Sequence, residues 1–307
     1  MKNGNRRAIA SMISLIERGG EGAESCQKLL QEHTGQAWRI GITGPPGAGK
    51  SSIVAELTKV FRAHSHRVGI VAVDPSSPLT EGAVLGDRIR MPELDSDPDV
   101  FIRSVATRGE TSGLSLETSS IADVLDASGF DIVMIETTGI GQVELQVASL
   151  VDTTVVVLVP ESGDQVQAIK AGMMEVADVY LLNKCDRPGA KTALTLLDSA
   201  LRFEGKNENG WHTKAVATSA SNSEGILAAW EILHKHRDYL TENDRLTDRR
   251  FSQLEGRIKM KVNEIIREDL WSLGREQMLK KAIKEVFSNG TSILDSAESI
   301  VTNFRNS

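Results

Sequence analysis

The sequence predicts an α/β fold in which helices cover both faces of a mostly parallel β-sheet. Between residues 37 and 240, seven short runs rich in β-branched residues alternate with stretches of helical character. The runs are apolar on both faces, which is typical of strands buried inside a parallel sheet. The chain of 307 residues is also long enough for one such domain with accessory helices.

Residues 1–36 are expected to form an N-terminal helical segment. Ile9, Ile13 and Ile16 recur at helical spacing, and Gly19-Gly20 interrupts the pattern, which indicates one or two short helices. The basic start of this segment has neither the apolar core nor the small-residue cleavage site of a secretory signal. We therefore expect a cytoplasmic protein.

Residues 37–240 are expected to form the α/β domain itself. Its elements follow one another in a regular order, each apolar run leading through a loop into a helical stretch. We expect strands in WRIGIT, RVGIVAVD, DVFIRSV, FDIVMIE, TTVVVLVP, DVYLLN and KAVATS, and helices over 50–63, 114–128, 164–177, 189–204 and 224–239.

Residues 241–307 are expected to form a C-terminal helical extension. The polar stretch TENDRLTDRR, residues 241–250, is interpreted as a boundary or linker. The apolar stripe beyond it is longer than a surface helix needs, so it either packs onto its own domain or forms a dimerisation arm. The stripe consists of Leu254, Ile258, Val262, Ile265 and Ile266, continued by Leu270, Leu279, Ile283 and Val286.

The stretch GITGPPGAGKSS, residues 41–52, contains a complete phosphate-binding loop of the form GxxxxGK[ST]. Its glycines let consecutive backbone N–H groups face a phosphate, Lys50 places a charge between the β- and γ-phosphates, and the Ser51 hydroxyl is a ligand for Mg²⁺. The loop follows an apolar strand and opens a helix, which is the context that this chemistry requires. The expected nucleotide-binding residues here are Gly44, Pro45, Pro46, Gly47, Ala48, Gly49, Lys50, Ser51 and Ser52.

The stretch NKCD, residues 183–186, predicts which base is bound. It ends an apolar strand roughly 130 residues after the phosphate-binding loop. The Asp186 carboxylate can accept two hydrogen bonds from guanine N1–H and N2–H₂, and adenine offers no such pair of donors. The stem of Lys184 is expected to lie along the base, and Asn183 is expected to tie this loop to the phosphate-binding loop.

The stretch VATSAS follows the next strand and contains Ser219 and Ala220. These two residues fit a short loop whose backbone N–H groups meet guanine O6. Residues 37–240 are therefore interpreted as a GTP-binding G domain, with GTP as the nucleotide.

A third motif, in FDIVMIETTGIGQVE, indicates what the nucleotide is used for. Glu136 ends the strand where it can orient a magnesium-bound water, and the N–H of Gly139 can reach the γ-phosphate. Ile140 occupies the position at which a Ras-like protein carries its water-orienting glutamine, and the nearest glutamine is Gln142. We therefore expect slow intrinsic hydrolysis that awaits a partner. The candidate catalytic residues are Lys50, Glu136 and Gly139.

Two acidic residues, Asp74 and Asp87, lie between these motifs in VDPSSPLTEGAVLGDRIRM. One or both could approach Mg²⁺, since the prolines and glycines around them are typical of a loop that changes conformation. An ordinary surface loop with solvated acids is the alternative interpretation.

The three segments VDPSSPLTEGAVLGDRIRM, ETTGIGQVE and VPESGDQVQAIKAGMMEVADVYLLNKCD closely resemble the MeaB/ArgK group of P-loop GTPases. The resemblance covers roughly residues 6–235, and Glu136 in place of the more usual aspartate is part of it. It implies a magnesium and switch shell of Asp74, Asp87 and Glu136 beside Ser51. It also implies that residues 160–171 form an extra switch loop, with Asp164, Gln167 and Lys170 as the positions that couple to a partner. The chain departs from the family pattern within that loop, at Glu161-Ser162 and Gln165-Val166.

The resemblance further implies a GTPase chaperone of an adenosylcobalamin-dependent acyl-CoA mutase of the methylmalonyl-CoA mutase type. Such a protein binds Mg²⁺ with GTP or GDP and couples hydrolysis to loading and protection of the mutase cofactor. The mutase, its adenosyltransferase and a second copy of the chain are the partners implied. No cobalamin site is evident in the sequence.

Two alternatives are a metallochaperone GTPase for another metalloenzyme and a nucleotide-dependent kinase linked to amino-acid transport. For the first, His64 and His66 are the only close pair of histidines, and two histidines at a helix end are usually solvated. For the second, no catalytic-base signature accompanies the guanine motif.

Composition weighs against other classes of protein. The net charge of −7 and the aromatic content of 4% argue against a nucleic-acid partner. Two cysteines far apart in the sequence do not indicate disulfides or a zinc site. No apolar run approaches the roughly 18 residues that span a bilayer, so no membrane partner is expected.

Overall fold

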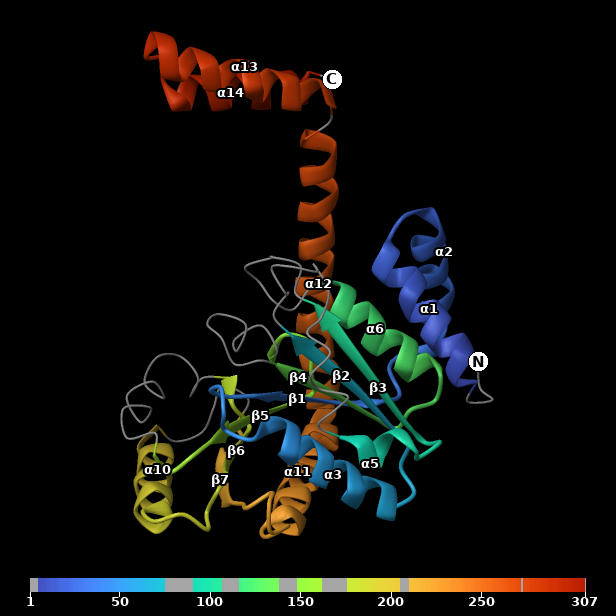
Figure 1. Cartoon of the computed structure of the whole chain (residues 1–307), viewed down its shortest axis with the longest axis vertical. Coiled ribbons are helices and arrows are strands. Elements are labelled where there is room, and N and C mark those ends of the chain that lie inside the picture. The colour runs from blue at the N-terminus through green and yellow to red at the C-terminus, as the bar shows by residue number, and fades with distance from the viewer. Residues whose placement is uncertain are drawn as a thin grey trace. The chain divides into compact units, whose positions relative to one another are not determined.

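The computed structural model describes residues 5–74, 91–106, 116–137, 148–161, 176–204, 210–271 and 273–306 (Figure 1). Contacts between residues divide the chain into two compact units, Met1–Gln253 and Leu254–Ser307. The first unit contains the sheet and the motifs of the phosphate and guanine sites. The second consists of helices.

The first unit is built on a parallel sheet of seven strands, as the sequence predicts. The sheet has the order β3-β2-β4-β1-β5-β6-β7, so β1 lies at the centre between β4 and β5 (Figure 1). Every described pair of neighbouring strands is parallel. The strands are β1 (Trp38–Thr43), β2 (Val68–Asp74), β3 (Val100–Ala106), β4 (Ile132–Thr137), β5 (Thr153–Leu158), β6 (Val179–Leu182) and β7 (Lys214–Ala217).

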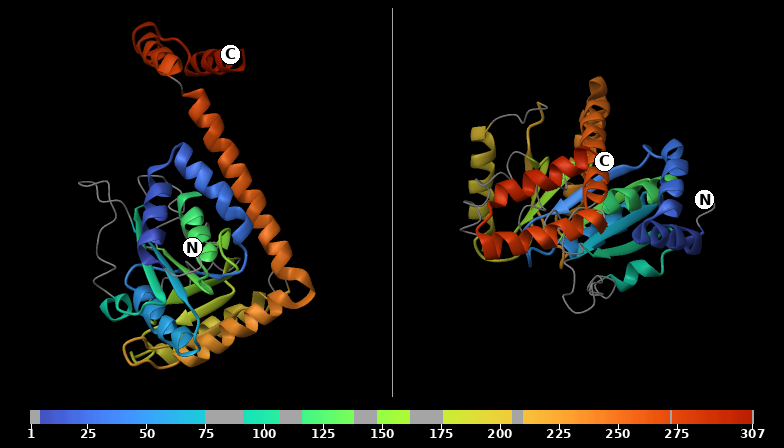
Figure 2. Two further views of the ribbon diagram at one scale, coloured as in Figure 1. Left: turned by 90° about the vertical axis from the view of Figure 1, so that its right-hand side faces the viewer. Right: turned by 90° about the horizontal axis from the view of Figure 1, so that it is seen from above.

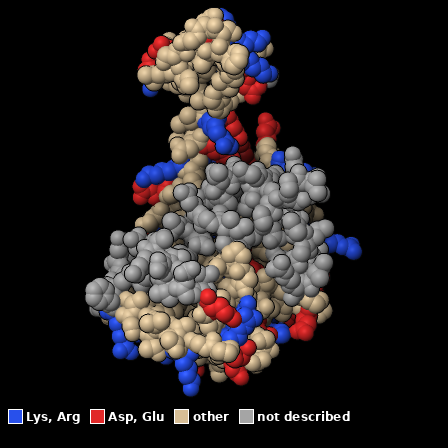
Figure 3. All heavy atoms as spheres, turned by 60° about the vertical axis from the view of Figure 1, so that its left-hand side comes forward, with Lys and Arg blue, Asp and Glu red and all other residues tan. Residues whose placement is uncertain are grey.

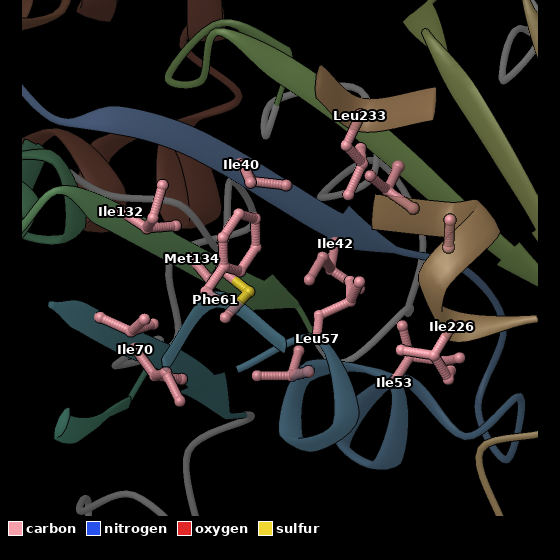
Figure 4. Close-up of a cluster of buried hydrophobic side chains, with 14 of the residues drawn as sticks. Ile40, Ile42, Ile53, Leu57, Phe61, Ile70, Ile132, Met134, Ile226 and Leu233 are labelled. Carbon is pink, nitrogen blue, oxygen red and sulfur yellow. The ribbon is translucent and has the colours of Figure 1, made fainter. Parts of the chain in front are cut away.

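One face of the sheet is covered by α3 (Lys50–Ala63) and α11 (Ile226–Thr241), with the short α5 (Pro92–Asp95) beside them. Figure 4 shows Leu57 and Phe61 of α3 lying against β1 and β4 in a cluster of buried hydrophobic side chains. Ile226 of α11 joins the same cluster from the neighbouring helix. Burial of these fully enclosed side chains is the main stabilisation of α3, whose first residue is Lys50.

The opposite face is covered by α6 (Leu116–Ala127) and α10 (Ala190–Glu204). The strand residues that contact α10, such as Val156 and Tyr180, alternate with those that contact α3 and α11. Gly69 in β2 lets α6 approach closely, since a Cβ there would lie 2.9 Å from Leu125 Cδ1. Both faces are therefore buried, which explains why the strands read as continuous apolar runs.

The N-terminal helices α1 (Arg6–Arg18) and α2 (Glu21–Leu30), followed by a 3₁₀ turn η1 (Gln31–His33), pack on α6. Figure 2 shows them beside α6, on the side of the sheet away from α3 and α11. The Asn5 side chain caps α1 by accepting hydrogen bonds from two backbone N–H groups of its first turn. Gly19 and Gly20 have φ values of 70° and 82°, and they break the helix where the sequence predicts.

The polar stretch 241–250, which the sequence analysis interprets as a boundary or linker, is mostly helical, and that interpretation is wrong for its second half. After a 3₁₀ turn η3 (Glu242–Asp244), helix α12 (Arg245–Leu270) begins directly. Its Arg249 donates to both carboxylate oxygens of Asp178, at 3.1 and 2.8 Å. The next residue, Arg250, donates to both oxygens of Asp152, at 2.9 and 2.8 Å. The stretch is rich in charge because two of its arginines pair with buried acids.

These ion pairs lie at the amino edge of the sheet, where β5 and β6 begin. Asp178 and Asp152 are 3% and 1% exposed. Burial alone would raise the pKa of Asp178, but Arg249 and His236 hold the pKa well below the ordinary aspartate value. Arg250 also donates to the carbonyls of Gly35 and Ala37, so it fixes the segment that leads into β1.

The second unit contains the remainder of α12 and the pair α13 (Leu273–Asn289) and α14 (Ile293–Arg305). Ser292 caps α14, and the guanidinium of Arg275 lies 5.1 Å from the Phe304 ring centre. An apolar hollow of about 490 Å³ lies among residues of this unit, including Trp271, Ile283, Phe287, Ile293 and Val301. The residues of the predicted stripe on α12, from Leu254 to Ile266, are each more than 40% exposed.

Candidate nucleotide-binding site

The predicted motifs meet at the carboxyl edge of the sheet. The strand order reverses at β1, because β2 lies on one side of it and β5 on the other. In open α/β sheets, ligands bind outside the carboxyl ends of the strands at such a point. Three loops gather there: the phosphate loop (residues 44–51) after β1, the NKCD loop (residues 183–186) after β6 and the base loop (residues 218–225) after β7.

The phosphate loop has the backbone geometry of an anion cradle. Gly44, Gly47 and Gly49 have φ values of 135°, 76° and 87°, which side chains disfavour. Gly44 also lies so close to β5 that a Cβ would overlap the carbonyl oxygen of Val157. Helix α3 begins at Lys50, so its first N–H groups and the positive end of its dipole face the loop.

Lys50 is folded into the phosphate loop. Lys50 is only 7% exposed, and its Nζ donates to the carbonyl oxygens of Gly44 at 2.8 Å and Pro45 at 3.0 Å. Pro46 and Gly47 are exposed at the crest of the loop, and Ser52 is exposed in the first turn of α3. A phosphate bound in the loop would therefore contact the buried Lys50 ammonium group on its protein side. Its opposite side would face solvent.

Ser51 and Glu136 form the polar contact on which the predicted metal site depends. Ser51 Oγ donates to Glu136 Oε1 at 2.6 Å, and both residues are less than 10% exposed. The parallel register of β1 and β4, which pairs Ile42 with Glu136, brings the carboxylate beside the start of α3. Two adjacent oxygen donors suit a hard cation, so these residues fit Mg²⁺.

Asp74, the third predicted metal residue, ends β2. In the register of β2 and β4, Ala72 pairs with Glu136 and Val73 with Thr137, so the backbone of Asp74 lies two positions beyond the partner of Glu136. The structure does not describe its side chain. The remaining predicted residues of the catalytic, metal and coupling sets lie outside the described residues, and their roles stay predictions: Asp87, Gly139, Asp164, Gln167 and Lys170.

Asn183 connects all three loops. Its Nδ2 donates to the Ala48 carbonyl at 2.8 Å, which is the tie to the phosphate loop that the sequence predicts. Its Oδ1 accepts from the Ala220 N–H at 3.1 Å, which reaches the base loop as well. The approach is so close that a Cβ at Gly49 would overlap Asn183 Nδ2. Lys184, with φ of 60°, adds a bond from Nζ to the Gly47 carbonyl at 2.7 Å.

Asp186 is exposed, and its carboxylate is oriented by a serine hydroxyl. Ser219 Oγ donates to Asp186 Oδ1 at 2.6 Å and lies 3.1 Å from Ser221 Oγ. The hydrogen bond from Ser219 lowers the pKa of Asp186, so the carboxylate stays ionised as an acceptor. The sequence motif predicts only a backbone role for Ser219, because no local pattern pairs its hydroxyl with Asp186.

The N–H groups expected to meet guanine O6 already have acceptors within the protein. Ser219 N donates to the Glu224 carbonyl at 2.9 Å, and Ala220 N donates to Asn183 Oδ1. An incoming carbonyl oxygen would therefore share or replace the contact with Asn183. The contact of guanine O6 with this loop stays a prediction.

Charges elsewhere on the described surface are mixed in sign. On the face shown in Figure 3, described basic and acidic side chains lie next to one another. His64 stacks on Trp230 with 4.4 Å between ring centres, whereas His66 lies against Phe61. Within the described ranges, no three His, Cys, Asp or Glu residues are grouped as a metal site would need. Nor is any described helix both long enough and apolar enough to cross a bilayer.

Comparison with known proteins finds extensive similarity to GTPases. The model of a family described as methylmalonyl-CoA mutase-associated GTPase MeaB matches residues 9–275. A putative GTPase of Pyrococcus abyssi is 45% identical over 268 residues, which are 87% of this chain and 83% of the relative. The GTPase ArgK of Escherichia coli is 34% identical over 260 residues, covering 82% of this chain and 78% of ArgK.

Two further similarities bear on partners and fold. The mouse mitochondrial homologue of the methylmalonic aciduria type A protein is 33% identical over 267 residues, 81% of this chain and 64% of its own length. A crystal structure of a LAO/AO transport system kinase superposes with a TM-score of 0.74 at 25% identity. That comparison covers 99% of this chain and 95% of the other.

Proposed function

This chain belongs to the MeaB family of methylmalonyl-CoA mutase-associated GTPases, and we propose that it is the GTP-hydrolysing chaperone of a mutase of that type. The mutase would use adenosylcobalamin, and GTP hydrolysis would be coupled to loading and protecting that cofactor. The family assignment and the mouse homologue support the association with a mutase.

The observation that carries the nucleotide part of the proposal is the position of Asn183. One amide contacts the phosphate loop at Ala48 and the base loop at Ala220, so the two ends of a nucleotide would be read by loops held at a fixed spacing. Asp186, oriented by Ser219, would accept the two donors on the guanine edge. GTP and not ATP is therefore the expected ligand.

At the phosphate end, Lys50 would exchange its carbonyl partners for oxygens of the β- and γ-phosphates. Its buried ammonium and the N–H groups at the start of α3 would stabilise charge that develops during transfer to water. Ser51 would hold Mg²⁺ with Glu136, Asp74 and Asp87 in the surrounding shell, and the ion would supply further charge neutralisation. Because Ile140 replaces the usual glutamine, the intrinsic rate would be slow until the mutase orders a further group, for which Lys170 is our first candidate.

The C-terminal unit would supply the contact between two copies of the chain. The exposed apolar stripe on α12 and the apolar hollow in the second unit support a homodimer formed there. The mutase and its adenosyltransferase would be the other partners, and we place the complex in the cytoplasm.

The test is a GTPase assay with and without purified methylmalonyl-CoA mutase. We expect turnover to rise when the mutase is added, and the Lys170→Ala variant to keep its intrinsic rate but lose much of that rise. Lys50→Ala is the control, in which hydrolysis should be strongly reduced in both conditions. Identical turnover with and without mutases of several acyl-CoA specificities would contradict the chaperone role but leave the GTPase intact.

A kinase is the second candidate, because the superposed structure carries the description of a transport system kinase. Labelled γ-phosphate that appears on an amino acid or protein acceptor, and not as free phosphate, would favour it. Stoichiometric binding of nickel or zinc would instead favour a metallochaperone.

A further inference from the structure

The base loop is closed at its neck and anchored at its tip. At the neck, the backbones of Ser219 and Glu224 exchange two hydrogen bonds, of 2.9 and 3.0 Å. Gly225 follows with φ of 71° and leads into α11. The loop is therefore a compact unit that would move as a whole, and its first residues carry the contacts to Asp186 and Asn183.

The tip of the base loop is held by a side chain of the phosphate-loop helix. Ser223 has φ of 55°, a region that a serine adopts at some cost in energy, so contacts must hold it there. Its Oγ donates to Glu56 Oε2 at 2.6 Å, across 167 positions of sequence. A bond from a hydroxyl to an ionised carboxylate is among the stronger hydrogen bonds in proteins.

Glu56 is itself held in place on α3. Its side chain is only 15% exposed, and its other oxygen accepts from Lys59 Nζ at 2.8 Å. Lys59 in turn lies 3.0 Å from Glu93 of α5. Burial alone would raise the pKa of Glu56, but the hydrogen bonds from Lys59 and Ser223 outweigh this effect and hold the pKa below its ordinary value. The carboxylate therefore remains ionised.

We propose that Glu56 is a positioning residue for the guanine site, which fixes the base loop to the phosphate-loop helix and thereby keeps Ser219 oriented toward Asp186. The loops are then joined twice, by Asn183 at the neck and by Glu56 with Ser223 at the tip. This inference rests on the guanine role of Asp186 given under the proposed function.

Glu56 acts on base recognition and not on phosphate chemistry. Lys50 and Ser51 lie one to two turns before it on α3, where Lys50 donates to the phosphate loop and Ser51 donates to Glu136. Loss of the Ser223 bond would let the base loop tilt and would weaken the orientation of the Asp186 carboxylate. The predicted defect is therefore reduced discrimination between bases, with turnover at saturating GTP unchanged.

The test compares the affinities for GDP and inosine diphosphate. Inosine diphosphate lacks the 2-amino group from which Asp186 would accept a hydrogen bond. We expect the ratio of the two affinities to fall about threefold to tenfold in Ser223→Ala, which is the range of one typical intramolecular hydrogen bond. Glu56→Gln keeps an acceptor oxygen and should give a smaller fall. In both variants kcat for GTP should match the wild type.

Two matched variants serve as controls. Glu93→Gln removes the far end of the same network, and Glu255→Gln removes an exposed acid that pairs with Lys259 on α12. Both should leave the ratio unchanged.

An unchanged ratio in Ser223→Ala and Glu56→Gln would overturn the proposal, whether the two affinities stay the same or fall by the same factor. A wild-type protein that binds GDP and inosine diphosphate equally would contradict the guanine role of Asp186 itself.

Discussion

At the amino edge of the sheet, buried carboxylates are paired with arginines, whereas at the carboxyl edge the polar side chains contact loop backbones and one another. Asp178 and Asp152 each receive two hydrogen bonds from a guanidinium. At the opposite edge, Lys50 donates to two backbone carbonyls of the phosphate loop. Asn183 donates to one backbone carbonyl and accepts from one backbone N–H.

The difference separates a permanent structural contact from one that a ligand can replace. A guanidinium and a carboxylate neutralise each other fully, and breaking a buried pair leaves an uncompensated charge. A lysine that donates to carbonyl oxygens keeps its whole charge and can turn toward a phosphate at little cost. The amino edge is therefore expected to govern stability, and the carboxyl edge to govern nucleotide affinity and turnover.

The largest effect is expected at the amino edge. Replacing Arg249 with alanine leaves the buried Asp178 without its main partner, which should lower the free energy of unfolding by about 3–5 kcal/mol. Urea denaturation of the variant measures this. Lys259→Ala, which removes an exposed pair with Glu255, should leave the free energy of unfolding nearly unchanged. Equal costs for the two variants would erase the distinction between the edges.

Lys50→Ala should show the reverse pattern. We expect hydrolysis to fall by about 10²–10³ or more, because a preorganised charge at the transferring phosphate is lost. The free energy of unfolding should change little in comparison with Arg249→Ala. Single-turnover measurement with labelled GTP tests this, and a variant that keeps full turnover would show that the phosphate loop is not the active site.

Asp186→Asn tests base recognition at the carboxyl edge. An amide donor would face the guanine N1–H, so the affinity for GTP should fall about a hundredfold. Calorimetric titration gives the constant. Lys184→Ala is the milder companion, since the Asn183 contacts would remain. Undiminished guanine affinity in Asp186→Asn would remove this residue from base recognition.

The smallest effect is expected on acidification. The pKa of Asp178 is lower in the folded protein than in the unfolded chain, where it takes its ordinary value. The stability that this carboxylate contributes is thus present above about pH 4 and is lost as the pH falls further. Asp178→Asn should abolish that part of the acid dependence. If the wild type and Asp178→Asn lose stability in parallel between pH 5 and 3, carboxylates other than Asp178 determine the acid dependence.

Local patterns were sufficient for the strands, the phosphate loop and the NKCD loop. Each strand is a contiguous apolar run, and each loop is a contiguous motif whose position after a strand could be checked in the sequence. The contacts that join the loops could be predicted only where a motif implies them, as for Asn183.

Long-range pairing was beyond the sequence. Arg249 lies 71 positions from Asp178 and Glu56 lies 167 positions from Ser223, so no spacing rule connects them. An arginine that pairs with a buried acid cannot be told from a solvated arginine in one amino-acid sequence. Residues 241–250 therefore resembled a linker. The hydroxyl contact of Ser219 with Asp186 was missed for the same reason.

The glycine at position 49 leaves no room for even one methyl group beside the Asn183 amide. An engineer who alters base preference by moving the NKCD loop would disturb the triphosphate cradle in the same step. Retuning this enzyme toward another purine would thus demand concerted changes on both loops.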